Sequence, residues 1–361
     1  MCRWARRHSG RAKELLAGKL LRRCTDLTLS CSSRPGLACA IAQAPGSSHS
    51  MTIKPKSEAH LVTVADGVHA WIGAGGDSNA GAIETPEGVI VVDTQQHPRL
   101  AEQLRAAVLA RTGKPLRAVV NTHCHLDHTS GNTVFADVPI LSHWKALAAM
   151  EACLGPRYGE TWSISDFGTK LRLLFGHNIF ELVPEGDPVR RWFEGRIGLP
   201  DYDTVVIRAP NETFSDHFAF HLPDETVHLT YFGPAHSEGD IIVHLERRRV
   251  AFLGDLLFHG RFPWLGDCDL DGLIAVLGRV LALDIGVVVP GHGLPATLAD
   301  VAQFRDMLLE LRGAVAASVK AGHSEEAAIR EIALPQYAHV QRYAEWMPLD
   351  VRAAYRYLRE R

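Results

Sequence analysis

The stretch NTHCHLDHTSGN, residues 121–132, concentrates metal-binding side chains in one short segment. Three histidines and one aspartate fall within six residues: His123, His125, Asp127 and His128. Imidazole nitrogens and carboxylate oxygens are ligands of Zn²⁺, which usually takes four. In extended backbone, His123 and His125 point to the same side and can hold one ion. Asp127 and His128 are adjacent and diverge, so we expect them to serve a second ion beside the first.

Three further candidate ligands share one placement, at the carboxyl end of a predicted strand and beside a glycine. They are His236 in GPAHSEGD, Asp255 in FLGDLLF and His292 in VVPGHG. Glycine at such a position lets the backbone turn sharply and bring the neighbouring side chain to a crowded centre. With the first cluster they make seven candidate ligands, the number that two neighbouring ions would share.

Around these residues, short apolar runs alternate with turn signals, and this pattern predicts strands. The expected strands are residues 68–73, 79–85, 88–94, 116–122, 139–143, 203–210, 217–223, 227–234, 240–246, 249–255 and 285–293. Helical spacing of apolar residues predicts helices. The expected helices are residues 98–112, 144–154 and 269–283, with a nearly all-helical chain after residue 297. Because strands and helices mix without strict alternation, a layered α/β sandwich is favoured over a doubly wound sheet.

The motif HCHLDH, with His236, Asp255 and His292 following in this order, resembles the metallo-β-lactamase superfamily over roughly residues 60–295. The resemblance implies a four-layer αβ/βα sandwich with a dinuclear metal site at one edge of its two sheets. An aspartate at position 255 is similar to the bridging carboxylate of glyoxalase II-like, lactonase-like and ribonuclease Z-like members. True β-lactamases of the superfamily generally lack that residue.

Carried over residue by residue, the resemblance implies two groups of ligands and one shared ligand. The implied ligands of the first site are His123, His125 and His236. The implied ligands of the second site are Asp127, His128 and His292, and the implied bridge is Asp255. Two Zn²⁺ ions are the expected cofactors, and iron or manganese also fits this ligand set.

The chain divides into three expected parts. Residues 1–50 are rich in Arg and Ser and carry nine basic and two acidic residues. This composition resembles a transit peptide, although a disordered extension is the favoured interpretation. Residues 51–296 are expected to form the catalytic domain, with an insertion or lid at 155–203, and residues 297–361 a C-terminal helical segment.

The amino-acid composition limits the kinds of partner that the protein can have. Outside the N-terminal extension the chain carries 29 basic and 39 acidic residues, which argues against a protein that follows nucleic-acid phosphates. No apolar run approaches the length of a membrane span. Seven cysteines, four of them in the extension, do not make a disulfide framework. We therefore expect a cytoplasmic protein with a small-molecule acyl substrate and neither a membrane nor a nucleic-acid partner.

The substrate pocket is expected to come from the insertion and from residues 256–266. Four aromatic side chains in these segments are candidates for an apolar wall: Trp192, Phe258, Phe262 and Trp264. The alternative is that these aromatics pack in the core or in a lid.

These residues and the resemblance together predict a dinuclear zinc hydrolase. In it a metal-bridging hydroxide attacks the acyl carbon of an ester, thioester, lactone or lactam. Asp127 is the expected catalytic residue, since it can both bind metal and orient the nucleophile or accept its proton. Asp93, which ends a predicted strand, is the candidate for orienting one of the imidazoles.

Two alternatives remain open on the same fold. One is a mononuclear iron enzyme like the persulfide dioxygenases, and the other is a nuclease of the ribonuclease Z type. The complete second ligand set favours hydrolysis over the first alternative, and the acidic body disfavours the second.

Overall fold

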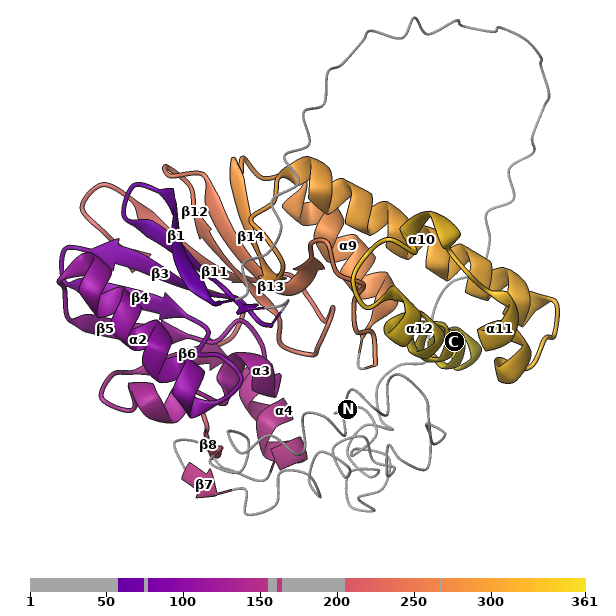
Figure 1. Cartoon of the computed structure of the whole chain (residues 1–361), viewed down its shortest axis with the longest axis horizontal. Coiled ribbons are helices and arrows are strands. Elements are labelled where there is room, and N and C mark those ends of the chain that lie inside the picture. Colours follow the sequence, from indigo (N-terminus) through magenta and orange to yellow (C-terminus); the bar gives the residue numbers. More distant parts are fainter. Residues whose placement is uncertain (1–57, 75–76, 155–160, 164–204, 267) are drawn as a thin grey trace, which may run out of the picture. The chain divides into compact units, whose positions relative to one another are not determined.

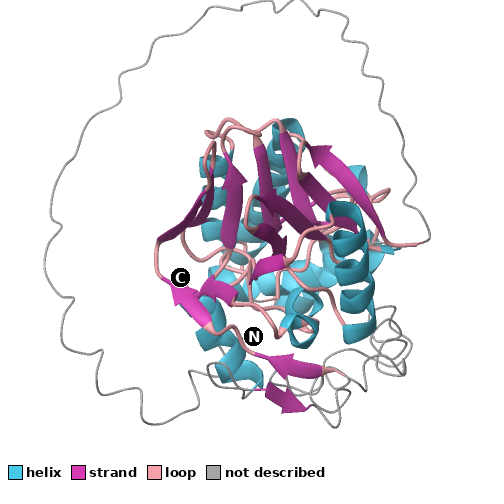
Figure 2. Cartoon of the chain, turned by 90° about the vertical axis from the view of Figure 1, so that its left-hand side faces the viewer, coloured by secondary structure: helices cyan, strands magenta, loops and turns pink. Residues whose placement is uncertain are grey.

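The computed structural model of the protein describes residues 58–74, 77–154, 161–163, 205–266 and 268–361. These residues belong to one compact unit in which two β-sheets face each other and helices cover their outer sides (Figure 1). Figure 2 shows the strands of both sheets between the two helical layers. The expected four-layer αβ/βα sandwich is thereby confirmed. The N-terminal extension and Trp192 lie outside the described residues.

The first sheet has seven strands in the order β1-β2-β3-β4-β5-β6-β9. The bounds are β1 His60–Ala65, β2 Val68–Ile72, β3 Ala80–Thr85, β4 Gly88–Val92, β5 Leu116–Val120, β6 Ile140–His143 and β9 Glu212–Phe214. Strands β1 to β4 pair antiparallel, whereas β4, β5, β6 and β9 pair parallel. The carboxyl ends of the parallel strands therefore meet at one edge of the sheet.

The second sheet has five strands in the order β10-β11-β12-β13-β14. The bounds are β10 His217–His221, β11 Thr226–Tyr231, β12 Ile241–Leu245, β13 Val250–Phe258 and β14 Val287–His292. All neighbours pair antiparallel except β13 and β14, which pair parallel. A separate two-stranded sheet joins β7 (Thr161–Ser163) to β8 (Val206–Arg208).

Alternating side chains of the two sheets form the central core. On one side Ile90 and Val120 point inward, and on the other Leu229 and Val243 meet them. The side chains between these positions point outward and pack on helices, as the two-residue period of a strand requires. Strands β4 and β12 are buried along their whole length, because a helical layer covers the face that does not point into the sandwich.

Helix α2 (Pro98–Thr112) covers the outer face of the first sheet with Leu104 and Val108. Pro98 lies in the first turn, where backbone N–H groups have no partner within the helix, so its missing N–H costs nothing. Gly113, in the left-handed conformation, caps the C-terminal end. The predicted bounds of this helix are those observed. The other elements on this side are α3 (Leu126–Thr129), η2 (Asn132–Phe135) and α4 (Trp144–Leu154).

The outer face of the second sheet packs on helices from the C-terminal part of the chain. Their bounds are α9 Leu270–Val280, α10 Leu298–Lys320, α11 Glu325–Glu331, η3 Pro335–Tyr337 and α12 Tyr343–Arg359. Asp269 caps α9, and Thr297 with Asp300 forms a capping box on α10. Leu308 of α10 and Val351 of α12 share one buried cluster with Leu253 of β13. The C-terminal helices thus extend the core of the second sheet.

The structure adds elements that hydrophobic periodicity did not predict. Strands β1 and β9 were not expected, and β13 continues to Phe258, beyond the predicted end at residue 255. Within the described part of the chain, no helix combines the length and apolar character that crossing a membrane requires.

Asp350 of α12 is a fully buried carboxyl group in this helical layer. Its Oδ1 accepts a hydrogen bond from the backbone N–H of Leu265 at 2.9 Å, and its Oδ2 is buried without a hydrogen-bond partner among the described residues. Burial raises the pKa of Asp350 well above its usual value, although the Leu265 N–H acts to lower it. The folded state therefore binds this proton more tightly than the unfolded state does.

We expect the free energy of unfolding to fall as pH rises from the unfolded-state pKa of Asp350 towards its higher folded-state pKa. Asp350→Asn keeps an oxygen for the Leu265 N–H and has no charge to bury. Relative to the wild type, the variant should gain up to about 1.4 kcal/mol of stability for each pH unit in this window. Urea unfolding of both proteins across pH measures the difference, and a pH-independent difference would contradict this assignment.

Candidate metal centre

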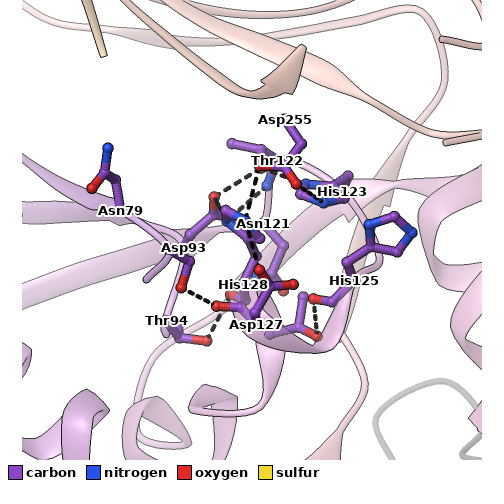
Figure 3. Close-up of polar contacts among 12 residues, drawn as sticks. Asn79, Asp93, Thr94, Asn121, Thr122, His123, His125, Asp127, His128 and Asp255 are labelled. Atoms are coloured by element: carbon purple, nitrogen blue, oxygen red, sulfur yellow. Dashed lines mark hydrogen bonds and ion pairs between the residues drawn. The ribbon is translucent and has the colours of Figure 1, made fainter. Parts of the chain in front are cut away.

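The seven predicted ligands lie together at the edge where the parallel strands of both sheets end. The loop after β5 supplies His123 and His125, and the short helix α3 supplies Asp127 and His128 (Figure 3). The second sheet supplies the remaining three, which are His236 after β11, Asp255 within β13 and His292 at the end of β14. Each sheet therefore provides part of the cluster.

One group of potential ligand atoms surrounds Oδ2 of Asp255. Nε2 of His236 lies 3.4 Å from this oxygen, and Nε2 of His123 lies 3.8 Å from it. Nδ1 of His125 completes the group at 2.9 Å from Nε2 of His236. These are the four residues of the predicted first site.

A second group surrounds the other oxygen of the same carboxylate, Oδ1. Nε2 of His128 lies 3.1 Å from it, and Nε2 of His292 lies 3.5 Å from it. Oδ2 of Asp127 lies 3.1 Å from the same His292 nitrogen. Asp255 therefore turns one oxygen towards each group, as a bridging carboxylate would.

The spacing and the unmet polar atoms fit bound cations. Four ligands at about 2.1 Å from one ion in a tetrahedron are about 3.3 Å from one another, close to the separations seen in both groups. Nε2 of His123, Nε2 of His128 and Oδ1 of Asp255 are buried without a hydrogen-bond partner in the described part of the chain. Buried polar atoms in proteins normally have partners, so these atoms fit the binding of a cation.

Two glycines make room for this arrangement. A Cβ at Gly291 would lie 1.9 Å from Oδ1 of Asp255, and one at Gly254 would lie 2.5 Å from Oγ1 of Thr122. Gly254 also has a φ of 52°, which side chains disfavour. Gly254 thus lets the second sheet approach the first at Thr122, and Gly291 leaves room for the Asp255 carboxylate between β13 and β14.

Asp93, at the end of β4, orients two of the imidazoles. Its Oδ2 accepts hydrogen bonds from Nδ1 of His128 at 2.9 Å and from the hydroxyl of Thr122 at 2.8 Å. Its Oδ1 accepts from the Thr122 backbone N–H at 2.8 Å. Because the Thr122 proton is directed to Asp93, its oxygen can accept from Nδ1 of His123 at 3.0 Å. One carboxylate thereby leaves Nε2 of both rings free to face the centre.

Further contacts hold the loops and were not expected from the sequence. The Ser78 hydroxyl donates to the backbone oxygen of Asp127 at 2.5 Å. The Asn79 side-chain amide donates to the backbone oxygens of Pro290 and Gly293, which flank the loop of His292. Both residues lie directly before β3, about fifty or more positions from their partners along the chain, and no local pattern signals such pairings.

The electrostatics of the cluster favour cation binding. Burial lowers the pKa of His123, and it lowers that of His236 to about 3. Burial also acts to lower the pKa of His128, but carboxylates outweigh it, Asp255 most, and raise that pKa well above its usual value. Burial acts to raise the pKa of Asp255, but His292 and His128 outweigh it and lower that pKa well below its usual value. The shared carboxylate is therefore ionised, and a cation can replace the proton on His128.

Three of the predicted pocket aromatics are described. The ring of Phe258 stacks on His292 at a centroid distance of 5.2 Å. Phe262 is fully buried and contacts Tyr343, and Trp264 contacts Trp346 of α12. Phe258 thus lies against the cluster, whereas the rings of Phe262 and Trp264 contact the C-terminal helical segment.

Solvent reaches the cluster from the side of the β5 loop. The side chain of Asp127 is 36% exposed, whereas those of His123 and His128 are fully buried. His125 is also partly exposed. A substrate would therefore approach past His125 and Asp127.

We expect Asp93→Asn to weaken metal binding by about 10–100-fold, because its one amide oxygen can replace either Oδ1 or Oδ2, and the NH₂ group then faces the hydrogen-bond donors at the other position. Asparagine tolerates the φ of 59° found at this position. Competition with a chromogenic chelator measures the affinity. Asp284→Asn, which alters an exposed carboxylate paired with Arg249, is the matched control. Equal affinity of the two variants would show that Asp93 does not orient the ligands.

The family model of the metallo-β-lactamase superfamily matches residues 73–292. A linear primary-alkylsulfatase of Pseudomonas sp. (strain ATCC 19151) is 25% identical over 223 residues, 60% of this chain and 41% of the relative. The alpha subunit of 2,4-dinitroanisole O-demethylase of Nocardioides sp. (strain JS1661) is 25% identical over 245 residues, 67% of this chain and 58% of the relative. The chain thus spans less than two thirds of either relative.

Solved structures share the fold at low sequence identity. The stereoselective inverting sec-alkylsulfatase Pisa1 from Pseudomonas sp. matches with a TM-score of 0.59 and 16% identity, over 82% of this chain and 50% of that one. A metallo-beta-lactamase from Pontibacter korlensis matches with a TM-score of 0.51 and 17% identity, over 70% of this chain and 99% of that one. At these identities the likeness concerns the fold alone.

Proposed function

The chain belongs to the metallo-β-lactamase superfamily, and from that premise we propose that it is a hydrolase working with two metal ions, most simply zinc. One observation carries the proposal, namely that the two oxygens of Asp255 face two different groups of ligands. A mononuclear iron enzyme would leave the second group without a role.

When bound, such ions lower the pKa of a water molecule and polarise the bond to be cleaved. The side chains of the protein position the reactants. Asp127 is the exposed carboxylate at the mouth of the cluster, so it can accept a proton or a hydrogen bond from the attacking water. Asp93 holds the His128 ring in place, and Phe258 provides an apolar surface beside His292.

We propose that the enzyme cleaves an ester-type bond of a small molecule. Carboxylic esters, thioesters, lactones and lactams place an electrophilic carbon beside an oxygen that a metal ion can polarise. The names of the two relatives add an alkyl sulfate and an aryl methyl ether to the substrates worth testing.

Chromogenic substrates of each kind can distinguish these bond classes. We expect purified protein to hydrolyse at least one of para-nitrophenyl acetate, para-nitrophenyl sulfate, para-nitroanisole and a chromogenic thioester. Prolonged incubation with a strong chelator should abolish the activity, and added Zn²⁺ should restore it. Activity that survives removal of all metal would contradict the proposal, as would oxygen consumption with a persulfide in place of hydrolysis.

A further inference from the structure

The cluster histidines differ in the groups that their outward-facing Nδ1 atoms contact. Nδ1 of His128 meets a carboxylate oxygen of Asp93, and Nδ1 of His123 meets the hydroxyl oxygen of Thr122. Both partners can accept a hydrogen bond, so each ring can carry its hydrogen on Nδ1 and present the lone pair of Nε2 to a cation. This is the usual state of a metal-binding histidine.

In His292, by contrast, Nδ1 faces a hydrogen-bond donor. Its Nδ1 lies 2.9 Å from Nη1 of Arg261. A guanidinium group has donors only and stays protonated in proteins, so Nδ1 of His292 must accept this hydrogen bond. A neutral ring then carries its hydrogen on Nε2. That nitrogen faces Oδ2 of Asp127 at 3.1 Å and Oδ1 of Asp255 at 3.5 Å, and both oxygens are acceptors.

The backbone around Arg261 is anchored on both sides. The N–H of Phe262 donates to the backbone oxygen of Gln341 at 2.7 Å, and the N–H of Gln341 donates to that of Gly260 at 3.2 Å. Phe258, three residues before Arg261, stacks on the His292 ring. The segment that carries the guanidinium is therefore fixed to the residues that precede α12, and the Arg261–His292 contact is part of the packed structure.

We propose that Arg261 makes the two metal sites unequal, so that the site of Asp127, His128 and His292 binds its ion more weakly than the site of His123, His125 and His236. An ion at Nε2 of His292 requires the ring proton to move from Nε2 to Nδ1. The new N–H at Nδ1 of His292 would then point at an N–H of the Arg261 guanidinium, since Nδ1 and Nη1 are 2.9 Å apart. Two donors cannot form a hydrogen bond with each other. Binding of the second ion must therefore displace Arg261.

This inference rests on the proposed dinuclear site and adds an order of loading to it. In the first group Thr122 can accept from Nδ1 of His123, so that ring can carry its hydrogen on the side away from the ion. The first ion should bind before the second as metal concentration rises. The second ion should be the one that chelators remove first.

Calorimetric titration of metal-free protein with Zn²⁺ tests the inference. For the wild type we expect two separate binding steps. Arg261→Gln removes the charge and offers an amide oxygen to an N–H at Nδ1, so the second step should become about 10–100-fold tighter while the first stays unchanged. Arg261→Lys keeps a donor-only cation and should retain the weak second step. Arg247→Gln, at an exposed arginine paired with Asp224, is the matched control.

The ring state can be observed without any metal or activity. Nitrogen NMR of metal-free wild-type protein should show the His292 ring with its hydrogen on Nε2, where Asp127 and Asp255 accept it. A hydrogen on Nδ1 in the wild type would overturn the inference, as would two ions bound with equal affinity or a second ion weakened in Arg261→Gln. If saturating metal loads only one ion in every variant, the dinuclear proposal itself fails.

Discussion

The sharing of one buried carboxylate between two groups of histidines is the interaction on which this site depends. Asp255 lies within β13, which pairs with β12 on one side and β14 on the other along its length, and its two oxygens face different sets of nitrogens. An ionised carboxylate in such surroundings needs positive charge nearby. Part of that charge can come from protonated His128, and metal ions can supply all of it.

The rest of the fold serves to bring these groups together from two separate sheets. Parallel pairing places the ends of β5 and β14 at one edge, and Gly254 lacks the side chain that would keep the sheets apart at Thr122. Buried hydrogen bonds of Asp93 with Thr122, and of Asn79 with the backbone of Pro290, then hold the loops on either side of the cluster in place. Rigid second-sphere contacts of this kind preserve ligand geometry before metal binds, which reduces the ordering required on binding.

Much of this arrangement could be predicted because its signals are local. The strands around the site are short apolar runs that end at a polar ligand, and α2 carries a proline and a glycine at its ends. The role of Asp93 followed from its position after β4. The contacts of Ser78, Asn79 and Arg261 could not be predicted, because each joins residues that only the folded sheets bring together. Phe262 and Trp264 face helices far along the chain, which their local sequence does not reveal.

The central claim is that Asp255 holds two metal ions in one cluster. The most direct measurement is elemental analysis of protein saturated with Zn²⁺ and freed of excess metal, for the wild type and Asp255→Asn side by side. The account predicts two ions per chain in the wild type and a loss of both in the variant, because the amide replaces one shared oxygen and carries no charge. One ion per chain in the wild type, or two ions retained by Asp255→Asn, would contradict it.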